Sequence, residues 1–223
     1  MSTIAASKLA TKVPSVMIKA AMALSGVGLA LWLTLHMAGN MLWLLGPSMM
    51  DSYGSMLHGS GVLWPVRLLL VAGLVVHIAG AVLTTQRAHA ARPVSYRKLR
   101  SNASSLASRS MRWTGVVLVS FLLYHVASVY GVGHEHVPGG FHHNLSALLM
   151  QPWDALLLGV AAGLVAMHLS HGLASAFVSL GMISAKHEQL LRKSTRIWAY
   201  LVTAGFLLPP LVAWWVWAQR LLG

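Results

Sequence analysis

The sequence contains no cysteine. Disulfides, iron–sulfur clusters held by thiolates and covalently attached c-type haem all require cysteine sulfur, so the chain can carry none of them. Charged residues are also scarce, at 9% of 223 positions, whereas hydrophobic residues make up 57%. A soluble domain has about a quarter of its residues charged. The composition therefore indicates that lipid, and not one small protein core, covers the apolar surface.

Five apolar windows are each long enough for a helix to cross a bilayer, which takes about 20 residues. They cover residues 20–46, 64–85, 111–133, 153–181 and 197–217, and their only Lys or Arg residues are Arg67 and Arg112, each near one end of its window. The sequence therefore predicts an all-α, multi-pass integral membrane bundle of five transmembrane helices, organised as a single domain over residues 1–223. Pro209 and Pro210 are expected to kink the fifth helix or to end its regular hydrogen bonding.

Most Lys and Arg residues gather before the first predicted helix, between the second and third, and between the fourth and fifth. These groups are Lys8, Lys12 and Lys19; Arg87, Arg92, Arg97, Lys98, Arg100, Arg109 and Arg112; and Lys186, Arg192, Lys193 and Arg196. Because cytoplasmic loops retain cations, this pattern predicts a cytoplasmic N-terminus, a C-terminus outside and insertion in the cell inner (cytoplasmic) membrane. The net charge of +12 does not indicate nucleic-acid binding, since the cations mark alternate helix ends and form no single basic face.

Four predicted helices each carry one histidine well inside the apolar span, and the fifth carries none. These histidines are His36, His77, His125 and His168. An ionisable side chain at that depth is a candidate functional residue, although one neutral imidazole alone can be structural. At 1.5 Å per residue, His36 and His125 lie roughly 21–22 Å from the cytoplasmic ends of their helices, and His77 and His168 roughly 15–20 Å from theirs. The count indicates two facing pairs at two depths.

Two facing histidine pairs suit two haem b groups, each with its iron held from both faces. An iron with both axial positions filled by protein can only pass electrons. Zinc fits less well because it takes three or four protein ligands, and structural histidines or another metal are the alternatives. His171 lies one turn from His168 and is not expected to bind the same iron; a haem propionate or a loop carbonyl is its expected partner.

Four segments resemble the haem-binding helices of a known family, the single-chain, five-helix, dihaem cytochrome b anchors of succinate dehydrogenases and fumarate reductases. The segments are SGVGLALWLTLHMAGN, VVHIAGAV, RWTGVVLVSFLLYHV and HLSHGLASAFVSLG. The resemblance implies that His36 and His125 ligate the outer haem, and His77 and His168 the inner haem. It departs from some menaquinone-using members, which carry a glutamate where this chain has Ala166.

The resemblance also implies partners and a reaction. A flavoprotein subunit and an iron–sulfur subunit would dock on the cytoplasmic side, and the complex could assemble into higher oligomers. Electrons would pass between the iron–sulfur subunit and a membrane quinone, with menaquinone as the expected type. The dicarboxylate site would lie on the flavoprotein, so no catalytic residue is expected in this chain. The expected function is the anchor of succinate:quinone oxidoreductase (succinate dehydrogenase, complex II).

Other functions stay open on the sequence alone. A fumarate reductase anchor and the dihaem cytochrome b of another quinone-linked dehydrogenase share the same chemistry, and a transporter or inert membrane anchor is the non-redox alternative. Titratable groups on the outer side are expected to lie in solvated loops, with residues 134–143 forming a flexible one. These groups are Asp51, Glu135, His58, His134, His136, His142 and His143.

Overall fold

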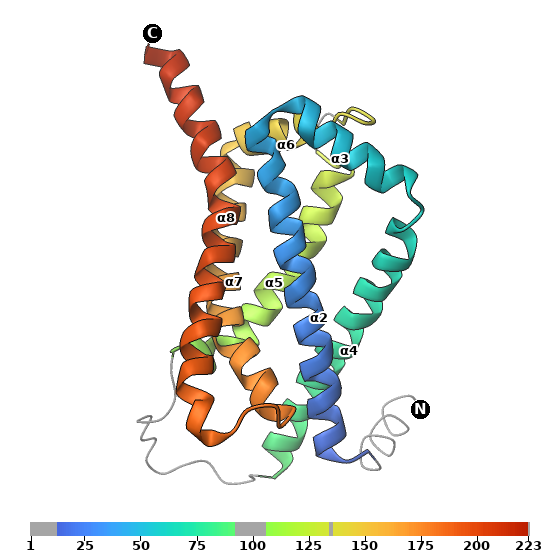
Figure 1. The fold of residues 1–223 in the computed structure, drawn as a ribbon, viewed down its shortest axis with the longest axis vertical. Coiled ribbons are helices and arrows are strands. Elements are labelled where there is room, and N and C mark those ends of the chain that lie inside the picture. Colours follow the sequence, from blue (N-terminus) through green and yellow to red (C-terminus); the bar gives the residue numbers. More distant parts are fainter. Residues whose placement is uncertain (1–12, 92–105, 134–135, 223) are drawn as a thin grey trace.

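The computed structural model describes residues 13–91, 106–133 and 136–222, and every regular element in them is a helix. Five of these helices are long and apolar enough to cross a membrane. They run side by side as a bundle (Figure 1): α2 (Ser15–Met41), α4 (Leu63–Ala90), α5 (Leu106–Val129), α7 (Pro152–Ser179) and α8 (Glu188–Leu222). The predicted all-α membrane bundle is confirmed.

Each transmembrane helix begins before its predicted window. Helices α4 and α8 also continue past the ends of their windows, whereas α2, α5 and α7 end before theirs. The largest difference is at α8, which begins at Glu188 where the apolar window predicts residue 197. An ion pair one turn apart, between Glu188 and Arg192 at 2.6 Å, supports this added segment. Pro209 and Pro210 lie inside α8 and do not end it, and the last part of the helix leans away from the bundle (Figure 1).

Two short helices that the sequence analysis does not predict lie across one end of the bundle, α3 (Pro47–Gly59) and α6 (Phe141–Met150) (Figure 1). Asp51 of α3 accepts a hydrogen bond of 2.8 Å from the backbone N–H of His142, in the first turn of α6. The indole N–H of Trp43 donates to the Ser146 hydroxyl at 2.9 Å. We call this pair of helices the outer cap, after the side of the membrane that the sequence predicts for it.

The outer cap corrects the expectation of solvated outer loops. The ring of His58 lies 4.8 Å from that of Phe141, and the ring of His142 stacks on Trp43 at 5.6 Å. His58, His136 and His143 are exposed as expected, whereas His142 is partly buried. His134 and Glu135 lie outside the described residues. Part of the segment predicted to be a flexible loop is therefore helical, because α3 and α6 pack on each other.

Helix α7 lies at the centre of the packing and contacts α2, α5 and α8, whereas α4 packs chiefly against α2. The buried side chains of α7 are mostly alanine: Ala161, Ala162, Ala166, Ala174 and Ala176. Membrane helices associate closely through such small residues because lipid supplies no hydrophobic drive for association. The α4–α2 crossing follows the same rule, since a Cβ atom on Gly80 would meet the Cβ of Met22 at 2.7 Å.

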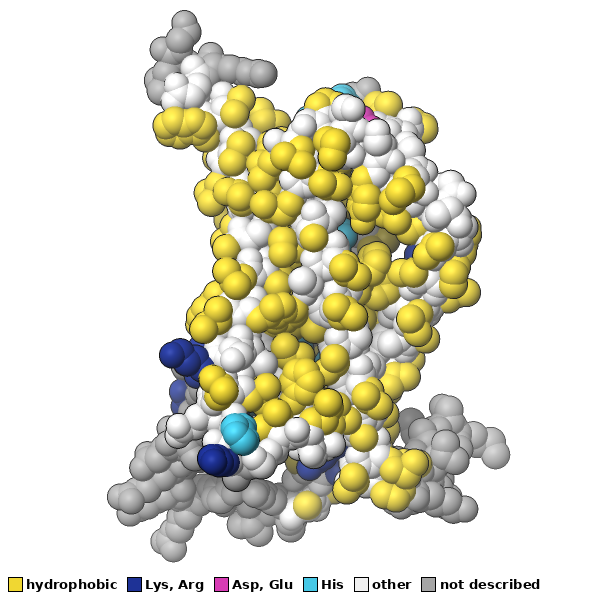
Figure 2. Space-filling view, in the orientation of Figure 1, with side chains coloured by type: hydrophobic (Ala, Val, Ile, Leu, Met, Phe, Trp, Pro, Cys, Tyr) yellow, Lys and Arg dark blue, Asp and Glu magenta, His cyan; other side chains and the backbone are white. Residues whose placement is uncertain are grey.

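The described Lys and Arg residues gather mainly at the end of the bundle opposite the outer cap, which we call the basic end (Figure 2). There Arg87 donates to the Ser15 hydroxyl at 2.7 Å and to the Val13 carbonyl at 2.8 Å, joining the end of α4 to the start of α2. Arg112 donates to the ring of His89 at 3.2 Å. Lys8, Lys12 and the predicted cations at 92–100 lie outside the described residues. The side of the membrane that the basic end faces stays a prediction.

Candidate functional site

The four histidines at membrane depth form two facing pairs. The ring centroids of His36 (α2) and His125 (α5) are 6.1 Å apart, with ring planes inclined at 76°. The ring centroids of His77 (α4) and His168 (α7) are 6.2 Å apart, with planes at 64°. A metal ion bound at about 2 Å by one nitrogen of each ring would separate the centroids by roughly 6 Å. We call the two sets the outer pair and the inner pair.

Hydrogen bonds on the inner pair leave one nitrogen of each ring available. The Nδ1–H of His77 donates to the Met22 carbonyl at 3.0 Å, which makes Nε2 the nitrogen with the free lone pair. The Nδ1 of His168 lies 3.2 Å from the Thr114 hydroxyl, which itself donates to the Met111 carbonyl at 3.1 Å. This hydroxyl can therefore accept from the His168 ring. Metal-binding histidines usually donate their second ring N–H in this way.

The outer pair is surrounded by aromatic side chains. Trp32 stacks on His36 at a centroid distance of 6.1 Å, and Phe206 of α8 lies 6.0 Å from the same ring. Phe121 stacks on His125 at 5.5 Å. The Nε2 of His36 accepts a hydrogen bond of 3.2 Å from the side-chain amide of Asn40, one turn along α2. A metal at that nitrogen would therefore displace Asn40.

Glycines give room beside the inner pair and elsewhere between the helices. A Cβ atom on Gly26 would lie 2.9 Å from Cε1 of His77, and one on Gly115 would lie 3.7 Å from Cε1 of His168. A Cβ on Gly28 or Gly73 would meet no atom within 4 Å. Between α2 and α4 the surface is hollowed, and histidine is visible inside the hollow (Figure 2). This space is compatible with a flat macrocycle.

The donor set also fits haem better than a bare metal ion. Among the described residues no group of three or more His, Asp, Glu or Cys side chains could hold a metal. Each pair offers two imidazoles, and a porphyrin supplies the four other nitrogen ligands that such an iron needs. Zinc would require a third protein ligand. The residues present therefore fit haem.

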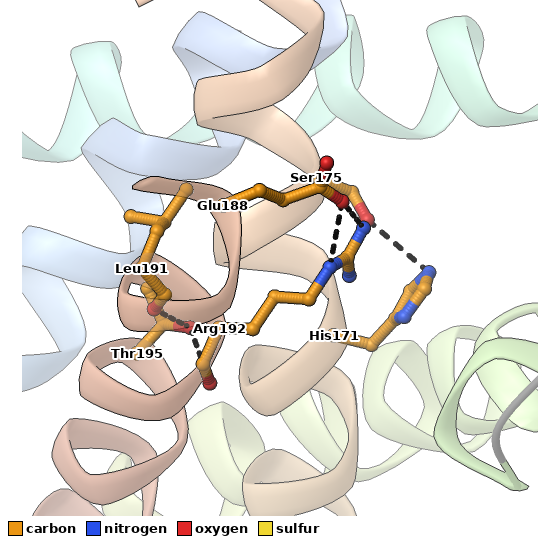
Figure 3. A network of polar contacts seen from close by, with 6 residues as sticks. All are labelled: His171, Ser175, Glu188, Leu191, Arg192 and Thr195. Atoms are coloured by element: carbon orange, nitrogen blue, oxygen red, sulfur yellow. Dashed lines mark hydrogen bonds and ion pairs between the residues drawn. The ribbon is translucent and has the colours of Figure 1, made fainter. Parts of the chain in front are cut away.

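His171 belongs to neither pair. Its Nε2 lies 3.2 Å from the Ser175 hydroxyl, one turn further along α7. The ion pair between Arg192 and Glu188 lies next to this contact, where α7 and the start of α8 approach each other (Figure 3). The Ser175 hydroxyl, on the same helix, is not the loop carbonyl expected from the sequence, and a propionate as partner stays a prediction.

One buried polar contact has no counterpart in the sequence analysis. The Tyr124 hydroxyl of α5 donates to the carboxylate of Asp154 in the first turn of α7, and Asp154 is only 3% exposed. The signal for this contact was present, because Asp154 is the one acidic residue inside the five apolar windows. The contact joins α5 to α7 one residue away from His125.

The five apolar helices define a multi-pass membrane protein with two facing histidine pairs inside its spans. The profile of the family described as succinate dehydrogenase/fumarate reductase transmembrane subunit matches residues 89–220, which is more than half of the chain. The chain belongs to this family, and the resemblance drawn from its motifs is confirmed. The matched region contains His125 and His168, whereas His36 and His77 precede it. Comparisons with curated proteins and with solved structures give no match.

Proposed function

We propose that this chain is the dihaem cytochrome b membrane anchor of a succinate:quinone oxidoreductase in the cell inner membrane. The observation that carries the proposal is the presence of two imidazole pairs, at 6.1 and 6.2 Å between ring centroids, in a member of this family. A transporter or inert anchor would have no need of two such pairs. The family assignment supports the membrane-anchor role, and the histidine geometry supports electron transfer.

In this proposal the chain holds and orients two b-type haems. His36 and His125 would hold the outer haem, and His77 and His168 would hold the inner haem. When bound, each haem supplies one-electron transfer between ferric and ferrous iron. The Met22 carbonyl and the Thr114 hydroxyl engage Nδ1 of the inner imidazoles, so that Nε2 of each ring would hold the iron. The surrounding aliphatic and aromatic side chains exclude water, which tunes the potential of such an iron.

The basic end would receive the soluble subunits of the complex. Arg112, Lys186 and Lys193 are among its described cations, and they suit an acidic protein surface or anionic headgroups. The flavoprotein subunit would carry the dicarboxylate site, and the iron–sulfur subunit would deliver electrons to the inner haem. A membrane quinone, with menaquinone as the expected type, would be the other substrate. The same architecture would serve fumarate reduction if electrons flowed in the opposite direction.

The test is to purify the complex through this chain and to measure its subunits, its haem and its electron flow. We expect a flavoprotein and an iron–sulfur protein to co-purify, about two haems b per chain by pyridine haemochrome analysis, and reduction of both haems by succinate. His168→Ala should remove the inner haem and His125→Ala the outer one. His171→Ala is the matched control and should retain both. Absence of haem in the purified complex would refute the proposal.

A further inference from the structure

The five apolar windows contain two arginines, Arg67 and Arg112. Arg112 lies at the basic end and contacts His89, whereas Arg67 lies near the other end of the bundle. It lies four residues after α4 begins at Leu63. His36 lies five residues before α2 ends, and His125 lies four residues before α5 ends. Because α4 starts at the end of the bundle where α2 and α5 finish, Arg67 is within roughly one helical turn of the level of the outer pair.

Arg67 lies on the partly buried side of α4, next to the exposed ring of Trp64. Arg67 is partly buried, like Val66, Leu70 and Gly73, which recur at spacings of three and four and form the inward stripe of the helix. Its neighbours on the lipid-facing side are far more open, with Leu68 69% exposed and Leu69 74% exposed. An arginine that served only to reach lipid headgroups would be expected on that open face.

The guanidinium has no acidic partner among the described residues. Its one described contact is with the ring of Trp64, 5.3 Å from the centroid. The acids that the structure describes are engaged elsewhere: Asp51 with α6, Asp154 with Tyr124, and Glu188 with Arg192. A charge in a membrane span normally faces a partner or a water-filled cavity. Within the part of the chain that the structure describes, Arg67 therefore has no acidic partner, and its guanidinium is available to bind an external anion.

We infer that Arg67 binds a propionate carboxylate of the outer haem, an inference that rests on the proposed function. Haem b carries two propionates, and a guanidinium binds a carboxylate through two parallel hydrogen bonds. The hollow between α2 and α4, in which histidine and basic side chains are both visible (Figure 2), gives space for this contact. A lipid phosphate offers the same oxyanion chemistry but would approach from the lipid-facing side of α4.

The experiment compares the purified wild-type complex with two variants, Arg67→Gln and the double variant Arg67→Gln/Leu68→Arg. The double variant moves the positive charge by one residue, onto the lipid-facing side of α4. Haem content and the midpoint potential of each haem are measured by redox titration, with the outer haem assigned through its loss in His125→Ala. We expect the potential of the outer haem to fall in Arg67→Gln, because a nearby positive charge favours the ferrous form. The inner haem should not change. The double variant should not restore the wild-type potential.

Three results would overturn the inference. The first is an unchanged potential of the outer haem in Arg67→Gln, and the second is a changed potential of the inner haem alone. The third is recovery of the wild-type potential in the double variant, which would show that Arg67 binds lipid headgroups. If Arg67→Gln does not accumulate in the membrane, Arg67→Lys keeps the charge without the forked geometry. It should then show a smaller fall of the same sign, and an unchanged potential would again overturn the inference. Wild-type complex without haem would refute the proposed function itself, which keeps the two failures distinct.

Discussion

Gly26 offers a direct test of how the inner pair is positioned, because a single methyl group added there would press on a proposed ligand. The Cβ of Gly26→Ala would lie 2.9 Å from Cε1 and 3.0 Å from Nδ1 of His77. Carbon atoms pack best at about 3.5–4.0 Å, so the ring has to move by at least about half an ångström. The hydrogen bond of 3.0 Å to the Met22 carbonyl opposes that movement.

The expected magnitude follows from this conflict. Overpacking of this kind costs about 1–3 kcal/mol, and disturbing the groups that orient a metal-binding histidine typically lowers affinity by about 10- to 100-fold. We therefore expect Gly26→Ala to weaken binding of the inner haem by about 10- to 100-fold and to leave the outer haem unchanged. Haem stoichiometry of the purified complex is measured as the complex is diluted or mildly heated. Redox titration then gives the potential of each haem that remains.

Gly163→Ala is the matched control. Gly163 lies on α7, five residues before His168, is exposed, and would place its Cβ within 4 Å of no other atom. Both Gly→Ala substitutions gain the same helix propensity, about 1 kcal/mol. The difference in inner-haem binding between the two variants therefore reports the contact with His77. Equal inner-haem retention and potential in the two variants would refute the reasoning.

Three further substitutions probe single hydrogen bonds. Thr114→Val removes the hydroxyl beside Nδ1 of His168 and should shift the inner haem potential while both haems remain, as redox titration would show; an unshifted potential would contradict this role. Tyr124→Phe leaves the buried carboxylate of Asp154 without this donor and should destabilise the protein by about 1–3 kcal/mol, measured as earlier loss of both haems on heating; unchanged thermal loss would count against it. Asn40→Ala removes the donor that occupies Nε2 of His36 and should tighten the outer haem by about 2- to 10-fold in a haem-binding titration; weaker binding would show that Asn40 supports the ligand.

The transmembrane helices and their histidines could be predicted because both depend on quantities that the sequence contains. Helix length and apolar content identify the spans, and the rise per residue gives the depth of each histidine along its helix. Depth alone places His36 level with His125. That the rings face each other also depends on helix rotation, which only the structure gives.

The outer cap could not be predicted for a physical reason. Residues 47–59 contain Pro, Gly and Ser among apolar residues and carry the signals of a loop. The helix forms because of contacts to residues far away in sequence. Asp51 accepts from the His142 backbone, and Gly54 lies so close to Phe141 that an added Cβ would meet its ring at 2.3 Å. Tertiary packing determines these elements, and local propensity does not.

The groups that hold the ring nitrogens were hidden for a different reason. The partner of His77 is a backbone carbonyl, that of Met22, and every residue has a carbonyl, so no side-chain pattern marks it. It becomes available in the membrane span because the glycines at 26 and 80 bring α2 and α4 close together, with Cβ positions 2.9 Å from the His77 ring and 2.7 Å from Met22. The signal in the sequence was therefore the pair of glycines at 26 and 80. They indicate a close approach of α2 and α4 only once it is known that these glycines lie on the faces where the two helices contact each other.

These hydrogen bonds make the two pairs unequal. In the inner pair, Nδ1 of both rings is engaged and both Nε2 atoms are left for a metal. In the outer pair, Nε2 of His36 is engaged with Asn40, so metal binding at that nitrogen would first have to break one hydrogen bond. A net hydrogen bond is worth about 0.5–1.5 kcal/mol, and this cost falls on the outer pair alone. The structure therefore preorganises the inner pair, next to the basic end, better than the outer pair beneath the cap.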